Sequence, residues 1–255
     1  MSFRWCFLLT LLLLAILAVP CAMADEPSAE AKEVGPPVDA FPDDWNFALR
    51  PYFFLSGLSG SVTVDPITIP LNSSFTDLLK YVQLGAFVNF TAEKGQWGAS
   101  GDFQYIDLYA TASDQSVLSM DLKNVIGEVD IFYRPGRAPS LRFLTGVRVY
   151  SVTQTFSTSR NEIPPASTTV VDLIIGAYGA WTLTDRWNFE LRGDIGGFGI
   201  SSEFTYQVMG LFHWDINDSL AIPFGYRVLG YNILDDSLRM DTRMGGVMLG
   251  LDIRF

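Results

Sequence analysis

The chain has 255 residues, of which 49% are hydrophobic and 14% aromatic, and its formal net charge is −11. This acidity argues against a nucleic acid as partner, because phosphates would repel the protein. Both cysteines, Cys6 and Cys21, lie in an N-terminal segment that we expect to be removed. The remaining chain would then have no disulfide, no thiol catalysis and no zinc site with sulfur ligands.

The first 24 residues have the features of a secretory signal peptide. Arg4 supplies a positive charge, residues 7–17 form an apolar run, and Ala22-Met23-Ala24 is a small-x-small cleavage site. The apolar run is too short to span a membrane as a helix. A lipoprotein signal at Cys21 is disfavoured because Pro20 occupies a position that requires a small residue. We therefore expect cleavage after Ala24.

Beyond the signal peptide, we expect two further segments. Residues 25–44 are rich in Glu, Ala and Pro and have almost no apolar pattern, which predicts a flexible periplasmic lead. Residues 45–255 contain no apolar run of helical span length, although the chain is strongly hydrophobic. A hydrophobic chain without helical spans indicates a transmembrane β-barrel.

Residues 45–255 alternate between apolar and polar or small side chains with a period of two, which is typical of β-strands. In one example, Trp187, Phe189 and Leu191 oppose Asn188, Glu190 and Arg192. About ten such segments follow one another, at residues 45–55, 83–92, 96–108, 121–134, 141–153, 170–182, 187–197, 203–215, 219–231 and 244–255. The fold class predicted is all-β, a transmembrane antiparallel up-and-down barrel.

The links between these segments alternate in length, as they do in outer-membrane barrels. They are short after the second, fourth, sixth and eighth segments, and longer at 56–82, 109–120, 154–169 and 232–243. The link after the seventh segment, 198–202, is the exception, because it would be a short outer loop. An even number of strands places both the N- and the C-terminus in the periplasm. Eight strands is the alternative if two weak segments merge or do not cross the membrane.

The composition of the two faces separates a membrane barrel from a soluble one. A soluble barrel has its apolar face inside and its charges outside. Here the apolar face carries aromatic residues near strand ends, as an interfacial girdle would, at Trp45, Trp97, Tyr133, Trp181, Trp187, Trp214 and Phe255. The polar face carries the charges, so we expect the charged side chains to line the lumen.

The predicted lumen contains seven arginines and seven carboxylates. They are Arg50, Arg134, Arg142, Arg148, Arg192, Arg227 and Arg254, and Asp102, Glu128, Asp130, Asp172, Glu190, Asp194 and Asp252. Unpaired charges in a narrow lumen would be costly, so this balance predicts cross-strand ion pairs. We expect a lumen that is packed with side chains or conducts only narrowly, because a barrel of this size has little free room.

His213 is the one histidine of the chain, and Asp215 lies on the same predicted strand face. A His–Asp pair could serve an outer-membrane hydrolase. No serine lies two residues from the histidine, as it does in barrel phospholipases and lipid A deacylases. We therefore favour a structural histidine. The scattered carboxylates form no spaced cluster of metal ligands, and we expect no metal and no cofactor.

Three stretches, LRGDIGGFGISSEFTYQV, FGYRVLGYN and GGVMLGLDIRF, resemble segments of small bacterial outer-membrane β-barrel proteins. The resemblance covers roughly Trp45 to Phe255 and is most specific in the last strand. It implies the barrel assembly machinery, with periplasmic chaperones, as partner during biogenesis. The assembly signal would comprise the terminal aromatic and the alternating apolar residues before it, Leu249, Leu251, Ile253 and Phe255.

The sequence thus predicts an integral protein of the Gram-negative outer membrane, in contact with its lipids and lipopolysaccharide. We expect a non-enzymatic role, either structural or as a narrow, porin-like diffusion channel with a charge-paired lumen. Two alternatives remain open. One is a surface hydrolase of lipid or peptide, and the other is a surface adhesin that acts through its outer loops.

Overall fold

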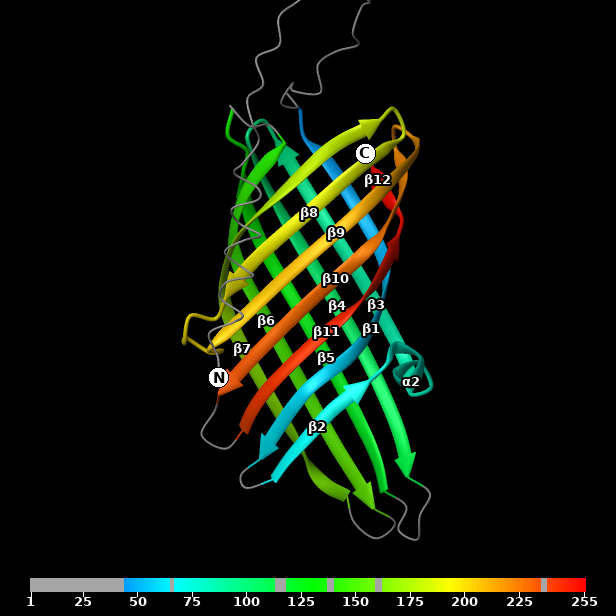
Figure 1. Cartoon of the computed structure of the whole chain (residues 1–255), viewed down its shortest axis with the longest axis vertical. Helices are drawn as coiled ribbons and strands as arrows, with labels where there is room; N and C mark the ends of the chain where they lie inside the picture. Colours follow the sequence, from blue (N-terminus) through cyan, green and yellow to red (C-terminus); the bar gives the residue numbers. More distant parts are fainter. Residues whose placement is uncertain (1–43, 65–66, 113–117, 137–139, 159–161, 235–237) are drawn as a thin grey trace, which may run out of the picture. The chain divides into compact units, whose positions relative to one another are not determined.

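The computed structural model describes residues 44–64, 67–112, 118–136, 140–158, 162–234 and 238–255. The predicted signal peptide and nearly all of the predicted lead fall outside these residues. The described chain folds into a closed barrel of ten antiparallel strands (Figure 1). This confirms the predicted fold class, and it decides for ten strands over eight.

The barrel wall is formed by long strands joined in chain order. The elements are β1 (Asn46–Val64), β2 (Ile67–Ser73), α2 (Phe75–Leu79), β3 (Val82–Lys94), β4 (Trp97–Ala112), β5 (Leu118–Tyr133), β6 (Leu141–Thr158), β7 (Glu162–Thr184), β8 (Trp187–Gly196), β9 (Phe204–Asn217), β10 (Leu220–Leu234), β11 (Leu238–Gly250) and β12 (Asp252–Arg254). Each predicted segment corresponds to one strand of the wall, and all of these strands except β8 are longer than predicted.

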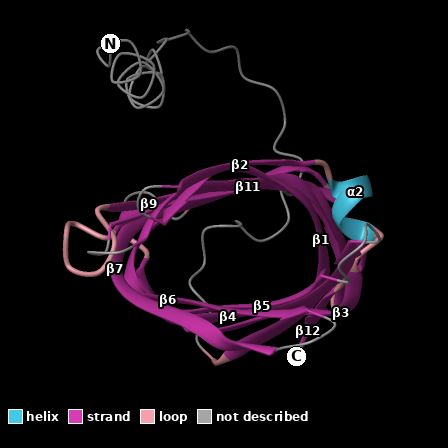
Figure 2. Ribbon diagram, turned by 90° about the horizontal axis from the view of Figure 1, so that it is seen from below, coloured by secondary structure: helices cyan, strands magenta, loops and turns pink. Residues whose placement is uncertain are grey.

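The ring closes because β1 pairs with β3 on one side and with β11 and β12 on the other (Figure 2). β11 and β12 are one barrel strand in one register, since Tyr52 lies opposite Gly250 and Leu49 opposite Ile253. Between them, the Leu251 amide donates to the Pro51 carbonyl at 3.0 Å. Proline has no N–H with which to complete the pair, which explains the interruption.

The two ends of the barrel differ. We call the end at which Phe255 lies the proximal end and the opposite one the distal end. At the proximal end β1 and the last strand meet, where Phe47 and Phe255 exchange both backbone hydrogen bonds at 3.0 Å. The links at this end, such as Asp185-Arg186 between β7 and β8, are short.

Large apolar side chains cover the outside of the barrel. Phe53 and Val129 are each 65% exposed, and Phe255 is 68% exposed. Pairs of aromatic rings lie near the proximal end, including Trp97 with Tyr133 and Trp187 with Trp214. An exterior of this kind is suited to lipid rather than to water. The outward register agrees with the one counted back from Phe255.

Toward the distal end the polarity of the two faces is reversed. Tyr150 and Val152 of β6 are buried inside the barrel. On the outside, Ser151 hydrogen-bonds Thr169 at 2.8 Å and Thr153 hydrogen-bonds Ser167 at 3.2 Å across β6 and β7. This part of the wall therefore resembles a soluble barrel, with an apolar inside and a polar outside.

This reversal corrects the prediction of long outer loops at 109–120, 154–169 and 232–243. Most of each range continues as strand, and the links outside the described residues are only 113–117, 159–161 and 235–237. The alternation persists there with polar side chains on the outside, such as the hydroxyls of Ser167 and Thr169 on β7 and the charged Arg239 and Asp241 on β11. The outward residues were not apolar, so the strands were predicted to end too early.

The segment 56–82 is also not a simple loop. β1 extends to Val64, β2 pairs with it from Leu58 to Val64, and Ser74 caps the helix α2 by accepting a hydrogen bond from the Asp77 amide at 3.3 Å. β3 pairs with β1 only opposite Asn46–Pro51. Within the described ranges, no helix is long and apolar enough to cross a membrane.

Candidate functional site: the barrel lumen

The lumen is filled by side chains in three zones. A central zone of charges lies midway along the strands, and further charge clusters lie toward the proximal end. Apolar side chains fill the distal part. Every wall strand contributes inward residues to one or more zones because alternate residues of each strand face inward.

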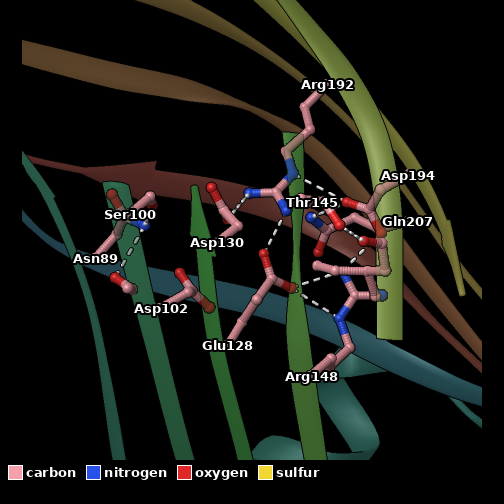
Figure 3. A network of polar contacts seen from close by, with 12 residues as sticks. Asn89, Ser100, Asp102, Glu128, Asp130, Thr145, Arg148, Arg192, Asp194 and Gln207 are labelled. Carbon is pink, nitrogen blue, oxygen red and sulfur yellow. Dashed lines mark hydrogen bonds and ion pairs between the residues drawn. The ribbon is translucent and has the colours of Figure 1, made fainter. Parts of the chain in front are cut away.

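The central charge cluster comprises Glu128, Asp130, Arg148, Arg192 and Asp194 from β5, β6 and β8 (Figure 3). The Arg148 guanidinium lies 2.6 Å from Glu128 and 2.7 Å from Asp194. Arg192 contacts Glu128, lies 2.9 Å from Asp194, and lies 3.4 Å from Asp130. The side chains of Arg148, Glu128 and Asp194 are at most 1% exposed. Such buried charges are tolerated only when they are paired and hydrogen-bonded.

Arg227 of β10 extends this cluster to the opposite wall. Its guanidinium donates to the Gln207 amide oxygen at 2.7 Å and to the Tyr52 hydroxyl at 3.1 Å, and it lies 3.3 Å from Asp102. The Tyr52 hydroxyl in turn donates to Asp102 at 2.9 Å. Nearby, the Asn89 amide donates to Ser100 at 3.1 Å (Figure 3). Polar contacts therefore cross the full width of the lumen.

A second group of charges surrounds His213 nearer the proximal end. Its Nδ1 lies 2.9 Å from Asp252 and its Nε2 lies 3.2 Å from Glu190. Arg50 contacts both carboxylates, at 3.3 Å from Glu190 and in a hydrogen bond to Asp252. The histidine therefore belongs to an ion-pair network. It does not pair with Asp215, which contacts Asn188 and Arg254 instead.

Arg134 and Arg142 share a carboxylate that the sequence reasoning had assigned to a link. Glu93 lies 2.7 Å from Arg134 and 3.3 Å from Arg142. Arg142 also lies over the Tyr178 ring, 4.6 Å from its centroid. Counting by twos along the lumen face from Asn89 would have placed Glu93 in the lumen.

Asp172 does not form the arginine pair expected of it. Its carboxylate accepts hydrogen bonds from the Ser202 amide at 2.9 Å and from the Ser202 hydroxyl at 2.7 Å. Asp172 and Ser202 are both fully buried. The carboxylate therefore fixes the link between β8 and β9, although Arg148 is its register partner on β6.

The distal apolar layer was missed by the sequence reasoning. Its most buried members are Leu229, Tyr231 and Ile233, at 0–2% exposed, and the Tyr150 and Tyr231 ring centroids are 4.5 Å apart. Other members are Phe54, Ile126, Val152, Val170, Met240, Met244 and Met248. Leu229, Tyr231 and Ile233 follow Arg227 at a spacing of two, so the inward register was visible in the sequence.

The terminal apolar residues face outward. Leu249, Ile253 and Phe255 are exposed, and the Phe255 ring stacks on Phe47 with centroids 5.9 Å apart. Asp252 and Arg254 alternate with these residues and face the lumen, where Asp252 pairs with Arg50 and Arg254 pairs with Asp215. Among the described residues, no three His, Cys, Asp or Glu side chains are grouped as ligands for a metal ion.

No protein-family model and no curated protein matches this chain. Among solved structures, the attachment invasion locus protein Ail of Yersinia pestis, in complex with the heparin analogue sucrose octasulfate, is 12% identical, with a TM-score of 0.41 over 83% of this chain and 98% of Ail. Neisserial surface protein A is 8% identical, with a TM-score of 0.33 over 82% and 97%. The translocator domain of the autotransporter NalP from Neisseria meningitidis is 8% identical, with a TM-score of 0.42 over 83% and 88%.

Proposed function

We propose that this chain is an integral protein of the bacterial outer membrane, with a non-enzymatic, structural role and a barrel that is closed to ions and solutes. The apolar exterior supports the membrane location, because side chains such as Phe53, Val129 and Ile131 would be exposed to water otherwise. An even number of strands leaves both barrel ends of the chain on one side, which the export route makes the periplasm.

The observation that carries the proposal is the filling of the lumen at two levels. At the central level, Arg148 and Arg192 pair with carboxylates of β5 and β8, and Arg227 of β10 pairs across the lumen with Asp102 of β4. At the distal level, the Tyr150 and Tyr231 rings contact each other among buried aliphatic side chains and methionines. A conducting lumen requires a continuous polar path for hydrated ions. The distal apolar layer does not provide one.

Conductance of the purified barrel in planar lipid bilayers tests the proposal. The refolded protein should insert and show no stable steps, or only very small ones, while an open porin measured in the same bilayer shows large ones. Insertion is checked independently by the slower migration of the heat-denatured barrel on gels. Large and stable porin-like steps from the wild-type chain would refute the closed lumen.

The hydrolase alternative has less support from the site geometry. His213 is buried, and both of its ring nitrogens lie next to carboxylates. A histidine that activates a nucleophile needs one ring nitrogen directed at a hydroxyl or at water. His213 of this chain is instead one member of the Arg50 charge network.

A further inference from the structure

The outside of the barrel has a groove toward the distal end, separate from the lumen. Its volume is about 240 Å³, and it lies where β1, β2, β10 and β11 meet. Residues from these four strands line it, among them Gly57, Ser59, Asn72, Tyr226, Arg243 and Gly245. Arg243 and Tyr226 come from the β10 and β11 side, and Asn72 from the opposite side.

The groove is open because its floor has no side chains at two positions. A Cβ atom at Gly57 would lie 2.8 Å from the Ser73 carbonyl oxygen. A Cβ atom at Gly245 would lie 3.1 Å from the Tyr226 hydroxyl. A larger residue at either position would therefore narrow the space between the two sides.

Hydrogen-bond donors around the groove are unused. Within the described part of the chain, neither the Arg243 guanidinium, the Tyr226 hydroxyl nor the Asn72 amide has a hydrogen-bond or ion-pair partner. Asp241 lies two residues from Arg243 on the same face of β11 and forms no ion pair with it. A cation, a hydroxyl and an amide around one cavity form a suitable donor set for the oxygens of a phosphate.

The groove lies where the exterior changes from apolar to polar. Along the outward face of β11 the residues run Leu249, Val247, Gly245, Arg243 and Asp241. Arg243 is opposite Gly230, and the Tyr206 ring covers Gly230. Tyrosine is enriched at the level of lipid headgroups. A ligand in the groove would thus have its polar part at Arg243 and the apolar exterior directly beside it.

We propose that this groove binds the phosphate group of an anionic membrane lipid. The phosphate oxygens accept hydrogen bonds from Arg243, Tyr226 and Asn72, and an acyl chain lies along Val247, Leu249 and Leu55. The apolar strip beside the cation favours a lipid over free phosphate, because only a lipid covers both. The inference rests on the proposed membrane location, but it does not depend on the closed lumen.

Native mass spectrometry of the detergent-solubilised barrel tests the groove. The probes are lipid A with its phosphates, the same lipid without phosphates, and inorganic phosphate. The wild type should retain one phosphorylated lipid. Arg243→Gln should weaken that binding about tenfold, because a charge-assisted contact is lost. Gly245→Leu, which fills the groove without changing its charge, should weaken it to a similar extent.

Arg239→Gln is the matched control, because Arg239 is exposed on the same face of β11 but is not part of the groove. Equal losses for Arg239→Gln and Arg243→Gln would overturn the proposal in favour of unspecific charge attraction. Equal retention of the dephosphorylated lipid, or equal Arg243-dependent binding of inorganic phosphate, would also overturn it. Gel migration confirms that each variant is folded. A barrel that does not conduct and does not bind lipid would overturn the proposal of a lipid site in the groove, while the proposal of a closed lumen would stand.

Discussion

Arg148 and Glu128 lie opposite each other on β6 and β5, and the Arg148 Nε–H donates to the Glu128 carboxylate at 2.7 Å. Both side chains are at most 1% exposed. Arg148 also contacts Asp194, so one guanidinium pairs with two carboxylates from different strands. Arg148 therefore links β5 to β8, and its side chain is fully buried whereas that of Arg192 is 10% exposed.

Arg148→Met should lower the free energy of unfolding by about 3–5 kcal/mol, because Glu128 and Asp194 would lose a buried partner. The measurement is urea unfolding in lipid vesicles, followed by tryptophan fluorescence. Arg239→Met, which removes an exposed arginine, should change stability by less than about 0.5 kcal/mol. A similar stability for both variants would show that the cluster is not desolvated.

His213→Ala should destabilise the barrel by about 1–3 kcal/mol, since Asp252 and Glu190 would each lose a buried polar partner. Asp215→Ala should cost less, because Asp215 pairs with Arg254, whose side chain is 38% exposed. Lipase and protease assays on membranes should give the same result for both variants as for the wild type. Hydrolytic activity that both substitutions abolish would instead support the hydrolase alternative.

Asp172→Ala should free the link between β8 and β9, because the Ser202 amide and hydroxyl would lose their acceptor. The expected loss is about 1–3 kcal/mol of stability, with faster amide hydrogen exchange at 197–203. Ser202→Ala removes only one of the two hydrogen bonds and should have the smaller effect. Unchanged exchange in Asp172→Ala would contradict a role in fixing this link.

Phe255→Ala should reduce assembly of the barrel in cells more than it reduces stability in vitro. Phe255 is 68% exposed, so its ring buries little protein surface, whereas an assembly signal would be read before folding ends. Phe53→Ala is the control, since Phe53 is 65% exposed but lies in the first strand. The assay is the heat-modifiable fraction in purified outer membranes. Equal assembly defects in both variants would argue against a C-terminal signal.

The strand register could be predicted from the sequence because lipid and lumen impose opposite demands on neighbouring residues. Phe255, Ile253 and Leu249 face outward, and Asp252 faces inward, as their alternation indicated. The same alternation continued beyond the expected strand ends. It was missed there because Ser151 and Thr153 replace apolar residues on the outside while Tyr150 and Val152 fill the inside.

The partners of the lumen charges could not be predicted in the same way. The strand register determines which residues on the two adjacent strands lie next to a given residue. A long guanidinium also reaches across the lumen, as that of Arg227 does to Asp102 on a distant strand. Glu93 forms ion pairs with Arg134 and Arg142, although it lies next to a turn and was predicted to belong to the link. Asp172 was satisfied by a backbone amide, for which the sequence has no pattern.

The central claim is that two layers close the lumen, and single-channel conductance of layer variants tests it most directly. One variant, Tyr150→Ala with Tyr231→Ala, opens the distal layer. A second, Glu128→Ser with Asp130→Ser and Arg192→Ser, opens the central cluster and leaves Arg148–Asp194 and Arg227–Asp102 as pairs. Each variant alone should stay closed or nearly so, and the combination should conduct in discrete steps. Conductance of the combined variant no larger than that of the wild type, or open steps after removal of one layer alone, would contradict the account.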